Sequence, residues 1–477
     1  MMFKNKWYIL LFLLLATVLS PLDFYIVNLA LPSIQHSLKS SSSELQMIVS
    51  FYTCAYAVFQ ISGGRFGDIY GRKKIFVIGL TGFICSSVLC GISQSSVIMI
   101  LGRVLQGVLG AVMIPQVLAI LHALFDEREK RLVMALYSFT FGIAAALGQY
   151  LGALLIEWNV FNLGWRVIFL VNLPVGLFAL IMAVIALPRQ ETKSSEQVDY
   201  RGTLLLSVGL ISFIYPLTTI VEQGVQIRTV LYLFVSALSL YLFFRVENKR
   251  KKQDKSVLVN FDIFKFKNLK LGVIVSFLYY ASGVFYLVLG IYLQENSHWT
   301  SMEAGKAIIP FGIGFIVMSL CSSMMSAFFK QAVLSLGLIL YGLGFLLLLY
   351  TLYNFSSFFF KFNLFVIGCG MGLTLASVVR LSLSNIPVQF AGLASGVVNC
   401  GLQIGSAFGV AAIGSVFFGI ANTVDYTLAF AVVLILISLF LLIALLLSFN
   451  LTRHLSSTLL TLSPLRNFDQ NEEKASE

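Results

Sequence analysis

Three polar residues lie inside long apolar stretches: Asp23, Arg103 and Gln106. Burial of charged or polar side chains in such an environment costs free energy. Asp23 is the one carboxylate that falls deep inside such a stretch. Burying an ionised carboxylate in a bilayer is expensive, so an intramembrane Asp is by default a functional candidate. Desolvation favours its protonated form, and a nearby cation favours its charged form. Asp23 is therefore our candidate for a group that takes up and releases a proton.

Arg103 is the expected partner of Asp23, because the two residues fall at similar depths. Asp23 lies about 8 residues, roughly 12 Å, from the outer end of the first span, and Arg103 lies about 6 residues, roughly 9 Å, inside the fourth. An arginine keeps its proton, so Arg103 would act as a fixed charge, and Gln106, one turn later, faces the same side. The alternatives are a permanent structural pair, an Asp23 that caps a kink after Pro21, and an Arg103 that extends to the outer surface.

The elements that hold these residues are predicted to be membrane-spanning helices. The chain has 477 residues, 58% hydrophobic and 11% charged, with a mean hydropathy of +0.91, a composition that excludes a soluble enzyme and a disordered protein. The first stretch also fits a signal peptide, but no small-residue cleavage pattern follows it. Apolar runs long enough to span a bilayer occur near 7–31, 45–64, 75–96, 97–121, 132–156, 167–187, 202–221, 229–245, 271–293, 304–329, 332–353, 358–383, 391–420 and 427–449.

The basic residues predict the orientation of these spans. With both termini in the cytoplasm, 25 of the 32 Lys and Arg residues fall in inner segments and five in outer ones, which follows the positive-inside rule. This distribution explains the net charge of +11 without nucleic acid as a partner. We expect a bundle of six spans at 1–188, a two-helix insertion with basic linkers at 189–270, a second bundle of six at 271–450 and a cytoplasmic tail at 451–477.

The segment 63–74, GGRFGDIYGRKK, is predicted to be an inner loop that acts as a conformational latch. Gly64 and Gly71 permit tight turns or close packing. Asp68 can accept hydrogen bonds from a helix N-terminus, and Arg72 can donate to helix ends. A latch of this kind would form and break as two bundles rock; a solvated basic loop is the simpler alternative.

Other motifs exclude several functions. Glycines at fourfold spacing, Gly148 and Gly152 among them, allow close helix packing. The histidines are scattered, and we find no Walker loop, no metalloprotease motif and no combination of nucleophile, base and oxyanion site. We therefore expect no metal, no cofactor and no enzymatic activity. Ser41 with Glu44, and Thr300 with Glu303, fit capping boxes that begin the second span of each block of six.

Taken in order, these motifs resemble the major facilitator superfamily, in particular its branch of drug:proton antiporters with fourteen spans (EmrB/QacA type). The resemblance covers the chain to about residue 450 and rests on LDFYIVNLALPSI (22–34), GRFGDIYGRKK (64–74), RVLQGVLGA (103–111), WRVIFLVNLPVG (165–176), DYRG (199–202) and AGLASGVVNCGLQIGSAFG (391–409). It implies an all-helical protein of the plasma membrane, with two six-helix bundles around a central cavity and alternating access.

The resemblance also implies proton-coupled efflux of hydrophobic or cationic drugs, with Asp23 and Arg103 coupling proton movement to transport. One motif departs from the family pattern, because the antiporter sequence Gly-Pro-x-x-Gly-Gly reads Gly148, Gln149, then Gly152 and Ala153 here. Polar and aromatic residues that we expect to bind substrate are Asn28, Gln60, Gln106, Tyr279, Tyr280, Asn399 and Gln403.

Three alternatives stay open. The changed motif keeps open a narrow-specificity exporter of one metabolite or siderophore, or an importer of the same fold. The basic segment 245–270 keeps open a non-transporting sensor or scaffold that binds a protein or anionic lipid. Besides substrate, protons and membrane lipid, a periplasmic adaptor protein is a further candidate partner.

Overall fold

A computed structural model describes residues 6–188, 198–253, 255–329, 332–354, 356–384 and 386–474, with side chains to residue 451 except at 127, 131, 327, 388 and 389. The described residues form helices and connecting turns and no strand. Fourteen helical stretches within them are long and apolar enough to cross a membrane, so the predicted number of spans is confirmed. We keep the orientation predicted from the basic residues and call the end with loop 39–41 the outer end.

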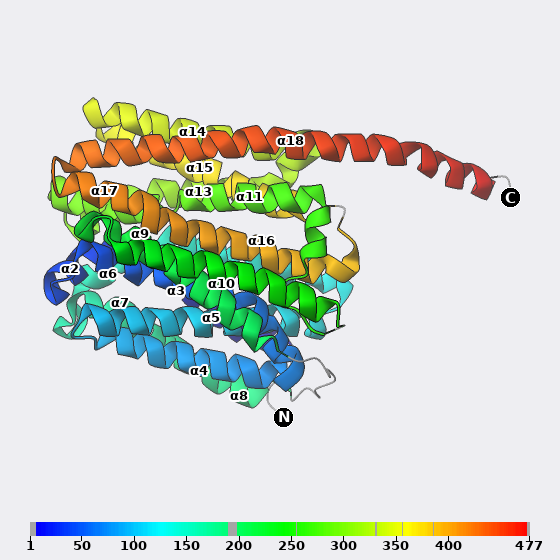
Figure 1. Cartoon of the computed structure of the whole chain (residues 1–477), viewed down its shortest axis with the longest axis horizontal. Coiled ribbons are helices and arrows are strands. Elements are labelled where there is room, and N and C mark those ends of the chain that lie inside the picture. The colour runs from blue at the N-terminus through cyan, green and yellow to red at the C-terminus, as the bar shows by residue number, and fades with distance from the viewer. Residues whose placement is uncertain are drawn as a thin grey trace.

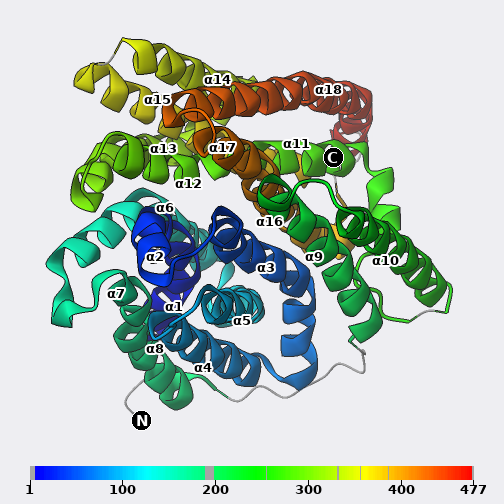
Figure 2. The same ribbon diagram turned by 60° about the vertical axis from the view of Figure 1, so that its left-hand side comes forward.

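The first eight helices form one group, which is in the lower part of Figure 2. The first span is interrupted and the sixth is built from short pieces, whereas the other four spans are single helices. The bounds are α1 (Lys6–Ile26), η1 (Asn28–Ala30), α2 (Leu31–Leu38), α3 (Ser42–Tyr70), α4 (Arg72–Gly91), α5 (Ser96–Leu124), α6 (Glu127–Trp158), η2 (Val160–Asn162), η3 (Gly164–Arg166), α7 (Val167–Leu170) and α8 (Asn172–Ala186).

Two helices of the predicted insertion, α9 (Tyr200–Gln223) and α10 (Ile227–Lys251), pack against each other and lie on one flank of the molecule (Figure 2). Helix α9 contacts α3 of the first group and α17 of the second. Helix α10 is largely exposed, which is consistent with a lipid-facing position for its apolar side chains. The insertion is thus attached to both groups through α9.

The remaining helices form the second group, and α18 extends beyond the rest of the molecule in Figure 1. The first and fifth spans of the second group are also interrupted. The bounds are η4 (Phe261–Lys265), α11 (Lys267–Ala281), α12 (Val284–Ile291), η5 (Tyr292–Asn296), α13 (Ser301–Phe329), α14 (Ala332–Tyr353), α15 (Ser357–Ser382), α16 (Val388–Phe408), η6 (Gly409–Ile413), α17 (Gly414–Ala421) and α18 (Tyr426–Lys474).

The second span of each group begins with the capping box that the sequence predicted. The Ser41 hydroxyl accepts from the Glu44 N–H at 3.2 Å, and the Glu44 carboxylate accepts from the Ser41 N–H at 2.8 Å. Thr300 and Glu303 make the same exchange at 3.2 and 2.8 Å. Both predicted capping boxes are therefore confirmed.

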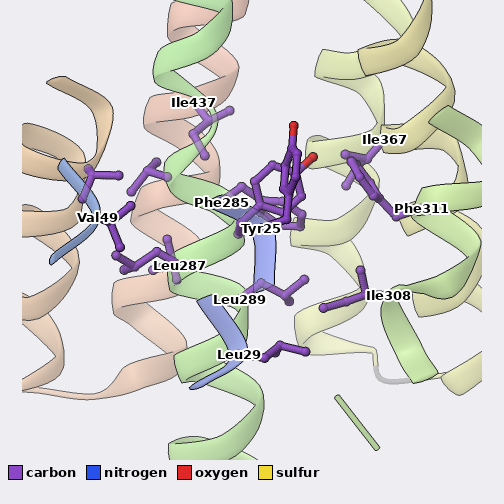
Figure 3. Packing of buried hydrophobic residues seen from close by; sticks show 14 of the residues in the cluster. Tyr25, Leu29, Val49, Phe285, Leu287, Leu289, Ile308, Phe311, Ile367 and Ile437 are labelled. Atoms are coloured by element: carbon purple, nitrogen blue, oxygen red, sulfur yellow. The ribbon is translucent and has the colours of Figure 1, made fainter. Parts of the chain in front are cut away.

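The two groups meet around the interruptions in their first spans. At the first interruption, the Asn28 amide donates to the carbonyls of Phe24 and Tyr25, at 3.0 and 3.3 Å, and so supplies donors to carbonyls near the break. In Figure 3, Tyr25 and Leu29 of the first group lie near Phe285 and Leu289 of the second, in one buried apolar cluster. Interrupted spans next to a central cavity are a feature of transporters.

Candidate functional site

A buried charge cluster lies inside the first group, where α1, α5 and α8 meet. Asp23 and Arg103 are both 0% exposed, and Arg103 Nη1 donates to Asp23 Oδ2. Arg103 Nη1 also donates to Gln106 Oε1 at 2.9 Å, and Gln106 Nε2 donates to Asp23 Oδ1 at 3.1 Å. The contact predicted from the depths of Asp23 and Arg103 is present, and Gln106 joins it.

Asn172 is a fourth member of this charge cluster, and the sequence analysis did not identify it. Its amide donates to Asp23 Oδ1 and to Ser87 Oγ, both at 2.9 Å. It is 1% exposed and is the first residue of α8. The available signal was a single Asn within the apolar motif 165–176, which the resemblance noted without giving the residue a role.

Arg103 is held on several sides. Its Nε donates to the Ile48 carbonyl at 3.2 Å, and its guanidinium carbon lies 4.1 Å from the centre of the Tyr52 ring. Its Nη2 is buried and has no hydrogen-bond partner. Removal of one member of such a pair leaves an uncompensated buried charge, so a proton on Asp23 would release Arg103 from its main partner.

A small cavity lies between the two groups, bounded by aromatic side chains. Its residues come from α1, from the α11–α12 interruption, from α15 and from α16: Phe24, Tyr25, Tyr279, Tyr280, Ser282, Gly283, Tyr286, Met371 and Ser406. The free volume is about 10 Å³, which is room for about one water molecule. No acidic or basic side chain is among its lining residues. Four of the lining residues are tyrosines, and we call it the tyrosine cavity.

Several polar groups in the tyrosine cavity are already paired. Tyr279 donates to the Met371 carbonyl at 3.0 Å, and Tyr286 donates to the Met371 sulfur at 3.0 Å. The hydroxyl of Ser406 is buried without a partner. The cavity can therefore offer hydrogen bonds to an uncharged ligand, from Ser406 at once and from the tyrosines after rearrangement.

Aromatic contacts join the tyrosine cavity to the charge cluster. The Phe24 ring, which lines the cavity, stacks on the Tyr52 ring with 6.4 Å between centres. Tyr52 in turn lies against the Arg103 guanidinium. A change in the position of Arg103 would therefore reach the cavity through two rings.

Only part of the predicted substrate-binding set lines this cavity. Tyr279 and Tyr280 do, whereas Asn28, Gln60, Gln106, Asn399 and Gln403 are not among the lining residues. The Asn28 amide bonds to the main chain near the break after α1, and Asn399 donates to the Ser395 carbonyl at 3.0 Å. The sequence missed Tyr25, Tyr286 and Ser406, since residues from separate helices have no common spacing.

The segment expected as an inner loop is mostly helix, so that expectation was wrong. Helix α3 continues to Tyr70 and ends at Gly71, whose φ of 93° favours glycine. The glycines within this part of α3 allow close packing, because a side chain at Gly67 would overlap Gln116 Oε1 on α5.

Of the predicted latch residues, Asp68 and Arg72 pair with each other, with Arg72 Nη2 donating to Asp68 Oδ1 at 3.3 Å. Arg72 Nη1 also donates to the Ala119 carbonyl at 3.0 Å. Gly64 lies against Pro115, 3.9 Å from where its Cβ would be. All of these contacts stay within the first group.

The altered antiporter motif lies on α6, which packs between α1 and α13. A Cβ on Gly148 would be 2.7 Å from Tyr25 Cβ, and one on Gly152 would be 2.8 Å from the Ile26 carbonyl, so α6 and α1 are in close contact. Gln149 is 0% exposed, and within the part of the chain that the structure describes neither polar atom of its amide has a hydrogen-bond partner.

Comparison with known families shows to which family the chain belongs. The model of the Major Facilitator Superfamily matches residues 13–256 and 271–465. The chain belongs to the major facilitator superfamily. It is therefore a multi-pass transporter of the plasma membrane rather than an enzyme, and the family and fold predicted from the sequence are confirmed.

Curated relatives include transporters and resistance proteins of Streptomyces. The chain is 31% identical to the probable actinorhodin transporter of Streptomyces coelicolor, over 88% of this chain and 74% of the relative. It is 31% identical to a puromycin resistance protein of Streptomyces alboniger, over 87% and 82%. The tetracenomycin C resistance and export protein of Streptomyces glaucescens is 28% identical, over 86% and 76%.

Solved structures support the fold. The xylose transporter of E. coli, in a partially occluded inward-open conformation, matches with a TM-score of 0.64 at 13% identity, over 94% of this chain and 99% of that one. A bacterial homologue of the human lysosomal transporter Spinster matches with a TM-score of 0.66 at 14% identity, over 94% and 97%.

Proposed function

We propose that the protein exports hydrophobic small molecules from the cell in exchange for protons. The observation that carries this proposal is the fully buried ion pair of Asp23 with Arg103, joined to the tyrosine cavity through Tyr52 and Phe24. Relatives named for antibiotic export and resistance support the direction and the general kind of substrate.

In the proposed cycle, Asp23 alternates between two states. A proton from the outer side binds its carboxylate and removes the charge that holds Arg103. The contact between the Arg103 guanidinium and the Tyr52 ring then changes. This change reaches the tyrosine cavity through the Phe24 ring, which stacks on Tyr52. When the carboxylate loses its proton to the cytoplasm, the ion pair forms again. Substrate and proton thus compete through one buried charge.

The lining of the tyrosine cavity favours an uncharged aromatic substrate over a cation. Rings of Phe24, Tyr25 and Tyr280 offer stacking surfaces, and hydroxyl groups offer hydrogen bonds. A cation would find ring faces but no carboxylate in the lining. The predicted class of hydrophobic or cationic drugs is narrowed here toward neutral aromatic molecules.

The predicted latch belongs to a different step of the cycle. We propose that Asp68 and Arg72 exchange their mutual contact for contacts with the second group when the inner end closes. Replacement of Asp68 with Ala should lower the rate of turnover and leave substrate binding intact. Unchanged transport by Asp68→Ala would contradict the role of the latch.

The buried Gln149 favours a second candidate, a narrow-specificity exporter or importer of the same fold. An amide without partners inside the protein could recognise one particular polar group. We also propose contacts with a periplasmic adaptor protein and with membrane lipid.

The test is a transport panel in proteoliposomes with an imposed pH gradient. The panel contains puromycin, tetracenomycin C and actinorhodin, with ethidium as the permanent cation. The account expects gradient-driven transport of at least one uncharged aromatic compound and weaker transport of ethidium. Transport of a single compound would favour the narrow-specificity candidate, and strong ethidium transport alone would contradict the proposed substrate class.

A further inference from the structure

A pair of buried acidic residues lies at the inner end of the insertion, far in sequence from the ion pair of Asp23 with Arg103. Asp199 precedes α9 and Glu247 lies in the last turns of α10; each is 1% exposed. One oxygen of each carboxyl group is occupied. Asp199 Oδ1 accepts from the Gly202 N–H at 2.9 Å, and Glu247 Oε2 accepts from the Val259 N–H at 2.7 Å.

The other two oxygens, Asp199 Oδ2 and Glu247 Oε1, are buried, and no residue in the described part of the chain donates a hydrogen bond to them. They flank one point in space, since a Cβ built on Gly202 would lie 2.9 Å from Asp199 Oδ2 and 2.5 Å from Glu247 Oε1. The same distances exclude a side chain at residue 202. Two acceptor oxygens therefore lie close to the same point, and neither accepts a hydrogen bond from a described residue.

Arg250 supplies one positive charge to this pair and does not satisfy both oxygens. Its Nε lies 3.0 Å from Asp199 Oδ2, but its Nε and Nη2 hydrogens point to the Ser256 carbonyl, at 3.0 and 2.9 Å. Two ionised carboxylates would thus share one guanidinium and leave one buried negative charge uncompensated, an arrangement that is strongly unfavourable.

Several charged or titratable groups that the structure describes near the pair have partners elsewhere. Arg65 of α3 donates to Ser256 Oγ, and Tyr70 of α3 pairs with Tyr200 of α9 at 3.2 Å. Lys251 donates to Asp262, and that hydrogen bond holds the pKa of the Asp262 carboxyl below its usual value. None of these hydrogen bonds reaches Asp199 or Glu247.

We propose that Asp199 and Glu247 bind one proton between them and form a proton site separate from Asp23. A proton on one carboxyl group supplies the missing donor, since its O–H donates to the facing oxygen of the other. It also leaves one net negative charge, which Arg250 balances. The motif Asp199 to Gly202 is explained by the same geometry, because Asp199 caps α9 and Gly202 leaves room for Glu247.

This proton site joins elements that connect the two groups. It holds the start of α9, the end of α10 and the segment at Val259 that leads to α11. Helix α9 is bonded to α3 through Thr203 and Ser62, at 2.9 Å, and to α17 through the Leu217 carbonyl and Ser415, at 2.6 Å. The orientation predicted from the basic residues places the site at the cytoplasmic end. Loss of its proton at high cytoplasmic pH would therefore loosen this joint.

The first test is infrared spectroscopy of the purified full-length protein during titration from about pH 6 to about pH 9. The wild type should show a carbonyl band of a protonated carboxylic acid, shifted in heavy water, that persists to neutral pH. Glu247→Gln should lose that band, while Glu222→Gln, a carboxylate at the other end of α9, should keep it. A band present in equal strength in Glu247→Gln would overturn the proposal.

The second test is thermal unfolding over the same pH range, which does not depend on transport or on its substrate. A proton bound in the folded protein and absent from the unfolded chain makes stability fall as pH rises. In Glu247→Gln the amide can donate to Asp199 Oδ2 at every pH and keep the Val259 bond, so this fall in melting temperature should be reduced. Equal pH dependence in wild type and Glu247→Gln would overturn the proposal.

Discussion

At the scale of single residues, the charge cluster is a buried anion with three donors around it. Arg103, Gln106 and Asn172 all donate to the Asp23 carboxylate. Each donor stabilises the charged form of Asp23, and loss of any of them favours the protonated form.

Replacement of Asn172 with Ala should weaken proton release from Asp23. It removes the donors to Asp23 and Ser87 and should cost about 1–3 kcal/mol of stability. The pH optimum of transport should also move to higher pH, because the carboxylate form of Asp23 loses one of its hydrogen-bond donors. The measurement is the pH profile of transport in proteoliposomes.

Asn363→Ala is the matched control for that change. Asn363 is an equally buried amide in the second group that donates to Thr351 at 3.4 Å. It should lower stability without moving the pH optimum. If both variants leave the optimum where it is in the wild type, Asn172 has only a structural role.

Gln149→Met should raise stability. The glutamine amide is buried without partners, and a methionine of similar shape removes an unsatisfied polar group worth about 1–3 kcal/mol. Gln116→Met is the contrasting control, because the Gln116 amide donates to the carbonyls of Gly63 and Val112 at 2.6 and 3.0 Å. Melting temperatures should move in opposite directions; a fall for Gln149→Met would mean that its amide is satisfied in the protein in solution.

The sequence was sufficient to pair Asp23 with Arg103, since depth along a helix can be counted in residues. It was not sufficient for Asn172, whose place depends on how α8 packs on α1. It also could not identify Tyr25 and Ser406 as neighbours in one cavity, because these residues come from different groups and meet only in the folded chain.

At the scale of elements, α6 and α13 carry much of the contact between the two groups. Their glycines make this contact close: a Cβ on Gly312 would lie 2.6 Å from the Ala146 carbonyl, and one on Gly305 would lie 2.5 Å from Ala153 Cβ. Small residues that let two helix backbones approach are a common means of packing within membranes.

Gly312→Leu should therefore separate α6 from α13. Overpacking of a close contact costs typically about 1–3 kcal/mol, and the conformation in which these helices touch should become less populated. We expect a lower melting temperature and a large loss of transport. Gly342→Leu on α14 is the control, since no atom lies within 4 Å of its added Cβ; equal effects of the two substitutions would show that this contact has no special part.

The end of helix α3 is a boundary that the sequence did not predict correctly. The glycines and charged residues at 63–74 predicted a loop, yet Gly63 and Gly67 lie within the helix. They are glycines there because α5 lies too close to leave room for a side chain. Only Gly71 has a backbone conformation that ends the helix. The packing partner, which the local sequence does not contain, distinguishes the two uses of glycine.

At the scale of the whole molecule, hydrogen bonds between the two groups gather at the outer end. Gln294 donates to the Leu29 carbonyl at 3.0 Å, and His36 pairs with Glu295 at 3.1 Å. Ser415 donates to Gln46 at 2.9 Å in the same half. These bonds close the outer end, which the account expects of a state that receives substrate from the cytoplasm.

The number of spans and the family could be predicted from the whole sequence, because apolar length and the order of motifs are properties of the chain itself. The relative placement of the groups could not, since it depends on contacts such as α6 with α13. The predicted orientation follows from the positive-inside rule alone.

The central claim is that Asp23 couples export to protons. The most direct measurement is gradient-driven transport in proteoliposomes by wild type and Asp23→Asn, with puromycin or another panel compound that the wild type transports, and binding of the same compound measured in detergent. The account predicts that Asp23→Asn binds the compound and does not accumulate it against a gradient, and that a protonophore makes the wild type behave in the same way. Equal proton-driven accumulation by wild type and Asp23→Asn would contradict the account.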